Sequence, residues 1–250
     1  MTEEIQKNNK LQVTLIIPTM NEIEGLKWFL PKVKKEWYDE MIIVDGGSTD
    51  GTIEYCEQNN YPIFVQSQKG LTMAVVEALH RSTKEIIITL SPDGNSLPEL
   101  IPQLADKMRE GYDMVIVSRY LGSAKSYDDD RCTAIGNKAF TVLINLLFGS
   151  KYTDSLVIFR AYRREALFAM GLERQDQENT LRKKYHLLNS WEIGSCARAA
   201  IMKLKTAEIP GDEPKRVGGN RKLNIAIHGT AALLQVIYEF ILGPKYIPKK

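Results

Sequence analysis

Short apolar runs alternate with longer segments of helical periodicity between Leu11 and Ser118. The apolar runs are rich in Ile and Val and end in turn-forming residues, which is typical of strands buried on both faces. They cover residues 13–17, 41–44, 63–65, 86–90 and 114–117. The helical patterns between them cover residues 22–34, 51–58, 72–81 and 97–109. This alternation predicts an α/β fold, with a Rossmann-like, mostly parallel sheet flanked by helices.

The second half of the chain is less regular. It predicts helices at 134–148 and 163–170, strands at 156–161 and 204–209, and a loop at 210–220 that is dense in Gly, Pro and charge. No internal repeat or linker divides the sequence. We therefore expect a polar tail at 1–10, one α/β domain at 11–222, and a C-terminal amphipathic helix with a basic tail at 223–250.

Composition narrows the class of protein. A chain of 250 residues with 44% hydrophobic content is large enough for one sizeable core, and a net charge of only +2 argues against a general nucleic-acid binder. The three cysteines are far apart, which favours a reducing cytoplasm over a disulfide framework or a zinc site. The polar first ten residues do not have the pattern of a secretory signal, and no apolar run reaches the roughly 18 residues of a membrane span.

Polar side chains gather where the predicted strands end. Ligands of open parallel sheets bind at the carboxyl ends of the strands, so these residues are the first candidates for a site. Carboxylates and amides suit ribose hydroxyls and a hard divalent cation, and arginine suits phosphate. The candidates are Pro18, Thr19 and Glu22 after the first strand, Asp45 after the second, Ser91, Asp93 and Asn95 after the fourth, and Arg119 after the fifth.

The strand ends carry motifs of a known family. Ile16-Ile17-Pro18-Thr19-Met20-Asn21-Glu22 and Val44-Asp45-Gly46-Gly47-Ser48-Thr49-Asp50-Gly51-Thr52 strongly resemble glycosyltransferase family 2. The likeness continues in order through Gln68-Lys69-Gly70, Ser118-Arg119-Tyr120, Phe159-Arg160-Ala161-Tyr162 and the segment from Arg216 to Lys222. Within the family the chain is most similar to the dolichol-phosphate mannose synthases and related polyprenyl-phosphate sugar transferases. The resemblance implies a GT-A fold, a nucleotide-diphosphate sugar donor, a divalent metal (Mg²⁺ or Mn²⁺) and inversion at the anomeric carbon.

The resemblance also implies roles for individual residues. Pro18, Thr19 and Glu22 line the nucleoside, and Asp45 contacts the base or ribose. Asp93 holds the metal that bridges the diphosphate, with Asn95 as a second ligand, and Arg216 and Lys222 close over the diphosphate. Arg119 and Arg131 bind the acceptor phosphate. The sequence departs from the family pattern at Ser91, which replaces the first acid of the usual Asp-x-Asp and can still bond to ribose, and at Gly46, which replaces an Asp.

The nature of the acceptor decides what catalysis needs. A phosphate acceptor is already an anion, whereas a hydroxyl acceptor needs a general base, for which Asp154 and Glu192 are the candidates. The leading hypothesis is an inverting transfer to a polyprenyl phosphate. One alternative is transfer to a hydroxyl of a glycan, lipid or protein. A second alternative is a nucleotide-sugar binding protein without catalysis, which the missing first acid motivates.

Two apolar segments suggest contact with a membrane surface. Residues 223–242 are mostly apolar but contain Asn224, His228, Gln235 and Glu239, and lysines follow them. This pattern is too polar to span a bilayer and favours a helix in the interface, beside anionic headgroups. Residues 140–148 offer a second apolar helix, although both segments can equally pack on the core. We expect a cytoplasmic protein, peripheral at the membrane, with no nucleic-acid partner.

Overall fold

The computed structural model describes residues 11–174, 190–218 and 225–246. The described residues form a seven-stranded sheet in the order β3-β2-β1-β4-β6-β5-β7. β6 is antiparallel to β4 and β5, and the other neighbouring strands pair in parallel. The strands are β1 (Val13–Thr19), β2 (Glu40–Asp45), β3 (Ile63–Val65), β4 (Ile86–Thr89), β5 (Met114–Ser118), β6 (Arg160–Arg163) and β7 (Thr206–Pro210). The predicted α/β class with a mostly parallel sheet is confirmed.

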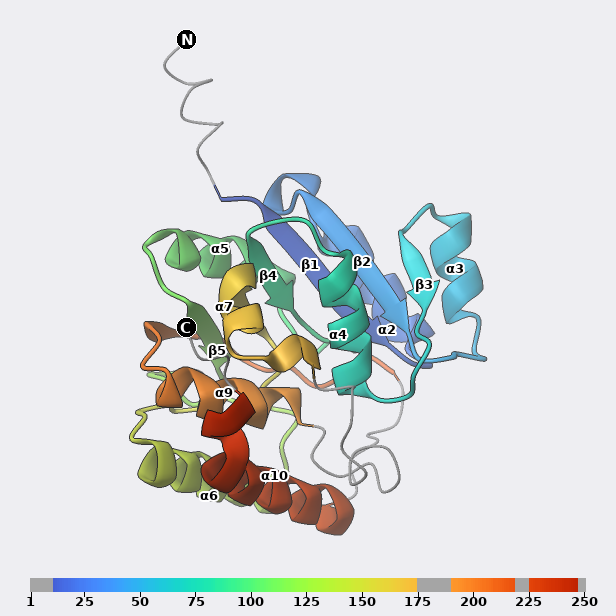
Figure 1. Cartoon of the computed structure of the whole chain (residues 1–250). Helices are drawn as coiled ribbons and strands as arrows, with labels where there is room; N and C mark the ends of the chain where they lie inside the picture. The colour runs from blue at the N-terminus through green and yellow to red at the C-terminus, as the bar shows by residue number, and fades with distance from the viewer. Residues whose placement is uncertain (1–10, 175–189, 219–224, 247–250) are drawn as a thin grey trace.

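The helices alternate with the strands in the first half of the chain, as the pattern predicts. The α-helices of the described residues in both halves are α2 (Ile23–Phe29), α3 (Thr52–Gln58), α4 (Leu71–Arg81), α5 (Ile101–Arg109), α6 (Arg131–Phe148), α7 (Arg164–Ala169), α9 (Trp191–Ile201) and α10 (Ile225–Tyr246). The helix predicted at 22–34 is shorter than expected, because Pro31 falls in a 3₁₀ turn, Leu30–Lys32, that ends it. α4 and α7 cover the near face of the sheet in Figure 1, and α2 lies behind it.

The strand predicted at 156–161 is wrong over most of its length. β6 begins only at Arg160, and Leu156 to Phe159 line a cavity instead of pairing in the sheet. β6 also lies between β4 and β5. The strand end that carries Arg119 is therefore one strand further from Asp93 than the order of the chain suggests.

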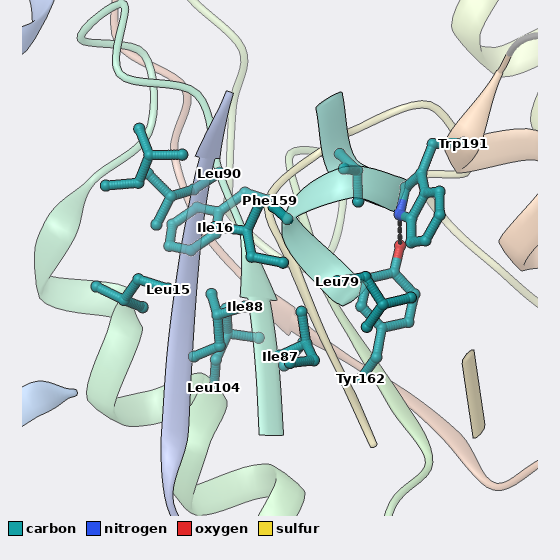
Figure 2. Close-up of a cluster of buried hydrophobic side chains, with 14 of the residues drawn as sticks. Leu15, Ile16, Leu79, Ile87, Ile88, Leu90, Leu104, Phe159, Tyr162 and Trp191 are labelled. Atoms are coloured by element: carbon teal, nitrogen blue, oxygen red, sulfur yellow. Dashed lines mark hydrogen bonds between the residues drawn. The ribbon is translucent and has the colours of Figure 1, made fainter. Parts of the chain in front are cut away.

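The core lies on both sides of the central strands. Every residue of β1 and β4 is buried, so helices and loops cover both faces of the sheet. Figure 2 shows Ile87 of β4 beside Leu79 of α4, whereas Ile88, on the opposite face of the sheet, lies with Leu15 and Leu104. At the edge of this cluster the indole nitrogen of Trp191 donates to the Tyr162 hydroxyl at 2.9 Å, which satisfies two polar groups inside the core.

Helices α6, α9 and α10 form a layer beside the sheet, and α6 and α10 lie next to each other at the bottom of Figure 1. A buried ion pair joins α10 to α9: Arg198 donates through Nε and Nη2 to the two carboxylate oxygens of Glu239, at 2.9 and 3.0 Å. Gln235 donates to the same carboxylate at 2.7 Å. The inner face of α10 is therefore held by specific polar contacts, which explain Gln235 and Glu239 among the polar residues that interrupt its apolar sequence.

Candidate functional site

The turn after β2 is organised by a buried carboxylate. Asp45 is fully buried, and its Oδ1 accepts hydrogen bonds from the backbone N–H groups of Gly47 and Ser48 at 2.8 and 2.7 Å. Its Oδ2 accepts from the Ser48 hydroxyl at 2.6 Å. Both carboxylate oxygens of Asp45 therefore stabilise the turn by accepting hydrogen bonds from its residues. The predicted contact of Asp45 with a nucleoside stays a prediction.

A second set of hydrogen bonds joins this turn to the end of β1. Asn21, in the left-handed region at φ 51°, accepts from the Thr49 N–H at 2.8 Å. Asp50 accepts from the Ile23 N–H at 3.1 Å and from the Thr52 hydroxyl at 2.6 Å. Burial alone would raise the pKa of Asp50, but these hydrogen bonds lower it below its ordinary value. The motif Asn21…Asp50 therefore fixes two neighbouring strand-end loops against each other.

A cavity of about 230 Å³ opens at the carboxyl ends of β1, β4 and β5. The structure brings several of the sequence-predicted residues together on its wall: Pro18, Ser91, Asp93, Asn95, Arg119 and Glu192. The loop from Leu156 to Phe159 supplies an apolar wall, and Gly211, Asp212 and Glu213 supply a polar one. Thr19, next to Pro18, is buried, and its hydroxyl has no hydrogen-bond partner among the described residues. A ligand with polar edges can satisfy that group.

Asp93 is a buried carboxylate on the cavity wall. Its Oδ1 accepts from the Asn95 N–H at 3.3 Å, and its Oδ2 lies 3.7 Å from Arg216 Nη2. Burial is the main cause that raises the pKa of Asp93, and the charge of Arg216 opposes it. The backbone carbonyl of Asp93 accepts from the Val217 N–H at 2.7 Å. Gly94, at φ 89°, is required beside it, because a Cβ there would lie 2.6 Å from the Val217 side chain.

The donor set of this wall fits a divalent cation. Asp93 and Asn95 offer carboxylate and amide oxygens, which Mg²⁺ and Mn²⁺ prefer. Within the described ranges no three acidic, His or Cys side chains form a metal-binding group. A cation held here therefore has room for phosphate oxygens and water as its other ligands, which is how Mg²⁺ is usually bound at diphosphates.

Arg119 lies in a network of carboxylates. Its Nε and Nη2 donate to Asp154 at 2.6 and 3.0 Å, and its Nη1 donates to Glu213 at 3.2 Å and lies 3.7 Å from Asp129. Burial alone would lower the pKa of Arg119, but the hydrogen bond and charge of Asp154, with the charge of Glu213, raise it, so the group stays a cation. Each guanidinium nitrogen is already paired in this conformation. The predicted role at the acceptor phosphate stays a prediction for Arg119, and the geometry favours a structural one.

The two candidate bases differ in their position. Asp154 is fully buried, both its oxygens accept from Arg119, and it is absent from the cavity wall. Glu192 lies in the first turn of α9, accepts from the Ser190 hydroxyl at 3.0 Å, and does line the cavity. Of the two, only Glu192 is placed to meet a substrate in that cavity.

The remaining predicted cations fall in three places. Arg131 is the first residue of α6 and is exposed, just after the cap Asp130, whose carboxylate accepts from the Thr133 N–H at 2.8 Å. Arg216 reaches Asp93 and also Asp128, at 3.0 Å from its Oδ2. Lys222 lies outside the described residues.

Asp128 and Glu213 were not predicted as site residues. The acidic run at 128–130 reads as a solvated turn in sequence, yet the Asp129 side chain is only 4% exposed and accepts from Tyr120 and Asn137. The one sequence signal available was the position of the run, directly before Arg131. Glu213 sits in a loop rich in charge, where the sequence does not distinguish a buried acid from a solvated one.

Comparisons with known proteins show which proteins this chain is similar to. Residues 14–169 match the family model of glycosyl transferase family 2. The chain is 30% identical over 161 residues to the glycosyltransferase AglJ of Haloferax volcanii, covering 64% of this chain and 53% of that protein. It is 30% identical over 123 residues to a dolichol-phosphate mannosyltransferase of Pyrococcus furiosus, covering 46% of this chain and 35% of that protein. The chain thus spans about half or less of the length of these two relatives.

Two further comparisons cover more of the chain. An undecaprenyl-phosphate mannosyltransferase of Micrococcus luteus is 24% identical over 243 residues, with 89% of this chain and 92% of that protein covered. Among solved structures, glucosyl-3-phosphoglycerate synthase from Mycobacterium tuberculosis, in complex with Mn²⁺, UDP and phosphoglyceric acid, superimposes with a TM-score of 0.67. That match has 20% identity and covers 99% of this chain and 82% of the other, so it shows the fold, which is GT-A as the sequence predicts.

Proposed function

The chain belongs to glycosyl transferase family 2, and from this premise we propose that it transfers a sugar from a nucleotide-diphosphate sugar to a polyprenyl phosphate. The observation that carries the proposal is the meeting of Asp93 with Arg216. These residues are far apart in sequence, both are assigned to the diphosphate by their motifs, and they face each other across 3.7 Å beside the cavity. The names of the relatives that act on dolichol phosphate and undecaprenyl phosphate support the class of acceptor.

The donor is expected at the carboxyl ends of β1, β2 and β4. Pro18, Thr19, Glu22 and Asp45 would bind the nucleoside, and Ser91 on the cavity wall would bond to ribose. Asp93 and Asn95 would hold Mg²⁺ or Mn²⁺ with the diphosphate, and Arg216 and Lys222 would donate to its oxygens. The metal would neutralise the charge that develops on the departing nucleoside diphosphate.

The acceptor phosphate needs no general base. A phosphomonoester has its second pKa near 6, so its oxygens are nucleophilic at neutral pH. One phosphate oxygen attacks the anomeric carbon as the bond to the nucleoside diphosphate breaks on the opposite face, which gives inversion. Arg131 begins α6, where the helix dipole also favours an anion. We therefore assign Arg131 to the acceptor phosphate and Arg119 to holding the loop at Asp154.

The same helix provides a surface for the lipid. Arg131, Ile135, Val142 and Leu146 are spaced by four or seven residues and so share one face of α6. The last three are 69%, 47% and 77% exposed. The neighbouring α10 also exposes apolar side chains: Ile227, Leu233, Leu234, Ile237, Phe240 and Ile241. We call these α6 and α10 side chains, from Ile135 onward, the apolar face.

We propose that the apolar face rests on the cytoplasmic surface of a bilayer. Within the described ranges, none of the helices could span a bilayer. A bilayer fits this face because its α6 side chains lie on the same side of the helix as Arg131, the cation assigned to the phosphate of the lipid. Lys138 on α6 is also exposed and can meet anionic headgroups. The prenyl chain of an acceptor bound at Arg131 would then extend toward the lipid. The division into a 11–222 domain and a membrane-associated C-terminal segment remains part of this proposal.

A hydroxyl acceptor is the second candidate, and one observation favours it. Glu192 lines the same cavity as Asp93, where a carboxylate could take a proton from an attacking hydroxyl. The two candidates differ in which residue is indispensable.

The first experiment identifies the donor and the acceptor class together. The purified chain is incubated with radiolabelled UDP- and GDP-sugars, Mg²⁺ or Mn²⁺, and undecaprenyl or dolichyl phosphate. The proposal predicts label in an organic-extractable product and none after Asp93→Asn. Label that appears only with hydroxyl acceptors would replace the leading proposal by the second, and binding of a donor without any turnover would indicate a non-catalytic binding protein.

A further inference from the structure

A second carboxylate, from a distant segment, lies beside Asp93. Asp128 precedes α6, and its Oδ2 is 3.0 Å from Arg216 Nη2. The same nitrogen is 3.7 Å from Asp93 Oδ2. The side chains of Asp93 and Asp128 are only 10% and 14% exposed. One cationic nitrogen therefore contacts two largely buried carboxylates, of which Asp93 lies on the cavity wall where the metal is expected.

The charges of Asp93, Asp128 and Arg216 do not balance. Two carboxylates face one guanidinium, so this group of three side chains carries an excess negative charge in a poorly solvated place, which is costly. Arg216 is also incompletely bound: its Nε is buried and has no hydrogen-bond partner among the described residues. A divalent cation would balance both carboxylates, and an anion would satisfy the guanidinium.

Asp128 can supply the carboxylate that is missing from the strand end after β4. The strand end after β4 has Ser91 where the family has its first acid, so the local chain supplies one carboxylate in place of two. Mg²⁺ and Mn²⁺ at diphosphates are usually held by one or two carboxylates with phosphate oxygens and water. A carboxylate from another segment can restore the second ligand if the fold brings it to Asp93.

We propose that Asp128 is the second carboxylate ligand of the divalent metal, and that Arg216 occupies the cation position until metal and nucleoside diphosphate bind. Arg216 then leaves the two carboxylates and donates to the diphosphate. This inference rests on the proposed function, since it presupposes a metal-bound nucleotide donor. It adds a metal ligand from outside the strand-end motif and a competition between an arginine and a metal for one site.

The simpler alternative is that Asp128 only anchors Arg216. The two accounts predict different effects of removing Asp128. If Arg216 competes with the metal, removing its guanidinium strengthens binding of Mn²⁺ alone. If Asp128 is only an anchor, Asp128→Asn leaves the affinity for Mn²⁺ in the presence of nucleotide unchanged, because Asp93 and Asn95 are then the protein ligands.

The test is a titration of the full chain with Mn²⁺, followed by electron paramagnetic resonance of the free ion, without nucleotide and with saturating UDP or GDP. Asp128→Asn and Asp93→Asn should each weaken Mn²⁺ binding about tenfold or more in the presence of nucleotide, the scale on which metal sites respond even to loss of supporting groups. Asp130→Asn is the matched control, since it removes a neighbouring charge while asparagine keeps the helix cap. Its affinity should stay near that of wild type, because asparagine caps a helix as well as aspartate does. Arg216→Met should bind Mn²⁺ alone several-fold more tightly than wild type does.

Each outcome decides the proposal. Wild-type affinity in Asp128→Asn, with affinity lost in Asp93→Asn, would overturn the role of Asp128 and leave the proposed function intact. Unchanged binding of Mn²⁺ alone by Arg216→Met would overturn the competition, even if Asp128→Asn failed to fold. Wild-type protein that binds neither Mn²⁺ nor nucleotide would overturn this inference together with the proposed function.

Discussion

The buried pair Arg198–Glu239 should control how firmly α10 is held on the domain. Both side chains are at most 2% exposed, and Arg198 makes two hydrogen bonds to Glu239 and two, through Nη1, to the carbonyls of Met170 and Gly171. Arg198→Met leaves the Glu239 carboxylate buried with Gln235 as a remaining donor and leaves two carbonyls without this donor. Loss of one partner of a buried pair costs about 3–5 kcal/mol, a large share of the roughly 5–15 kcal/mol that stabilises a typical domain.

The assay is urea unfolding followed by tryptophan fluorescence and by circular dichroism. A double-mutant cycle with Glu239→Leu separates the pair from the packing, because Arg198→Met/Glu239→Leu removes both charges and should recover much of the loss. Asp106→Asn is the control: its carboxylate pairs with Arg109 on the surface and is 68% exposed, so its loss should cost no more than about 1 kcal/mol. A loss under about 1 kcal/mol in Arg198→Met, or a double variant as unstable as the sum of the single ones, would refute the reasoning.

Three further predictions follow from burial and exposure. Asp45→Asn should cost about 1–3 kcal/mol in a thermal melt and weaken nucleoside-diphosphate affinity in calorimetry, because an amide cannot accept all three hydrogen bonds of the turn; unchanged values in both would contradict its role. Burial raises the pKa of Cys56 to about 11, so at pH 8 its thiol stays protonated and only the exposed Cys132 of this pair should react with N-ethylmaleimide, as mass spectrometry would show; equal labelling would refute it. Leu146→Glu should reduce co-sedimentation with anionic vesicles several-fold without changing stability. The control Val65→Glu, on the distant strand β3, should not reduce it. Equal binding by the two variants would refute the contact of α6 with the membrane.

The sequence predicts the strands of the sheet well where both faces of a strand are buried. The apolar runs at 13–17 and 86–90 became β1 and β4 because strands buried on both faces need no polar alternation. The run at 156–161 misleads because its apolar side chains face the cavity, a fact that depends on tertiary structure. The pattern predicts that α6 starts at 134, whereas the structure begins it at Arg131, because Asp130 caps it.

In the candidate site, too, the sequence predicts some of the residues and misses others. Pro18, Ser91 and Asp93 could be assigned together because parallel strands bring their ends to one edge of the sheet. The pairing of Asp128 with Arg216, and of Arg119 with Asp154 and Glu213, joins segments whose distance in sequence carries no local signal. Such charge networks become visible only when the loops are folded over the cavity.

The central claim is that the sugar passes to a phosphate, and the most direct measurement compares Arg131→Gln with Glu192→Gln in transfer of radiolabelled sugar to polyprenyl phosphate. The account predicts that Arg131→Gln raises the apparent KM for the lipid phosphate at least tenfold, the scale of a charge-assisted contact of about 1.5–3 kcal/mol, while donor affinity is kept. Glu192→Gln should retain transfer within a few-fold. Loss of about 10²–10⁴ in rate confined to Glu192→Gln, as for a general base, with Arg131→Gln near wild type, would contradict the account and assign a hydroxyl acceptor.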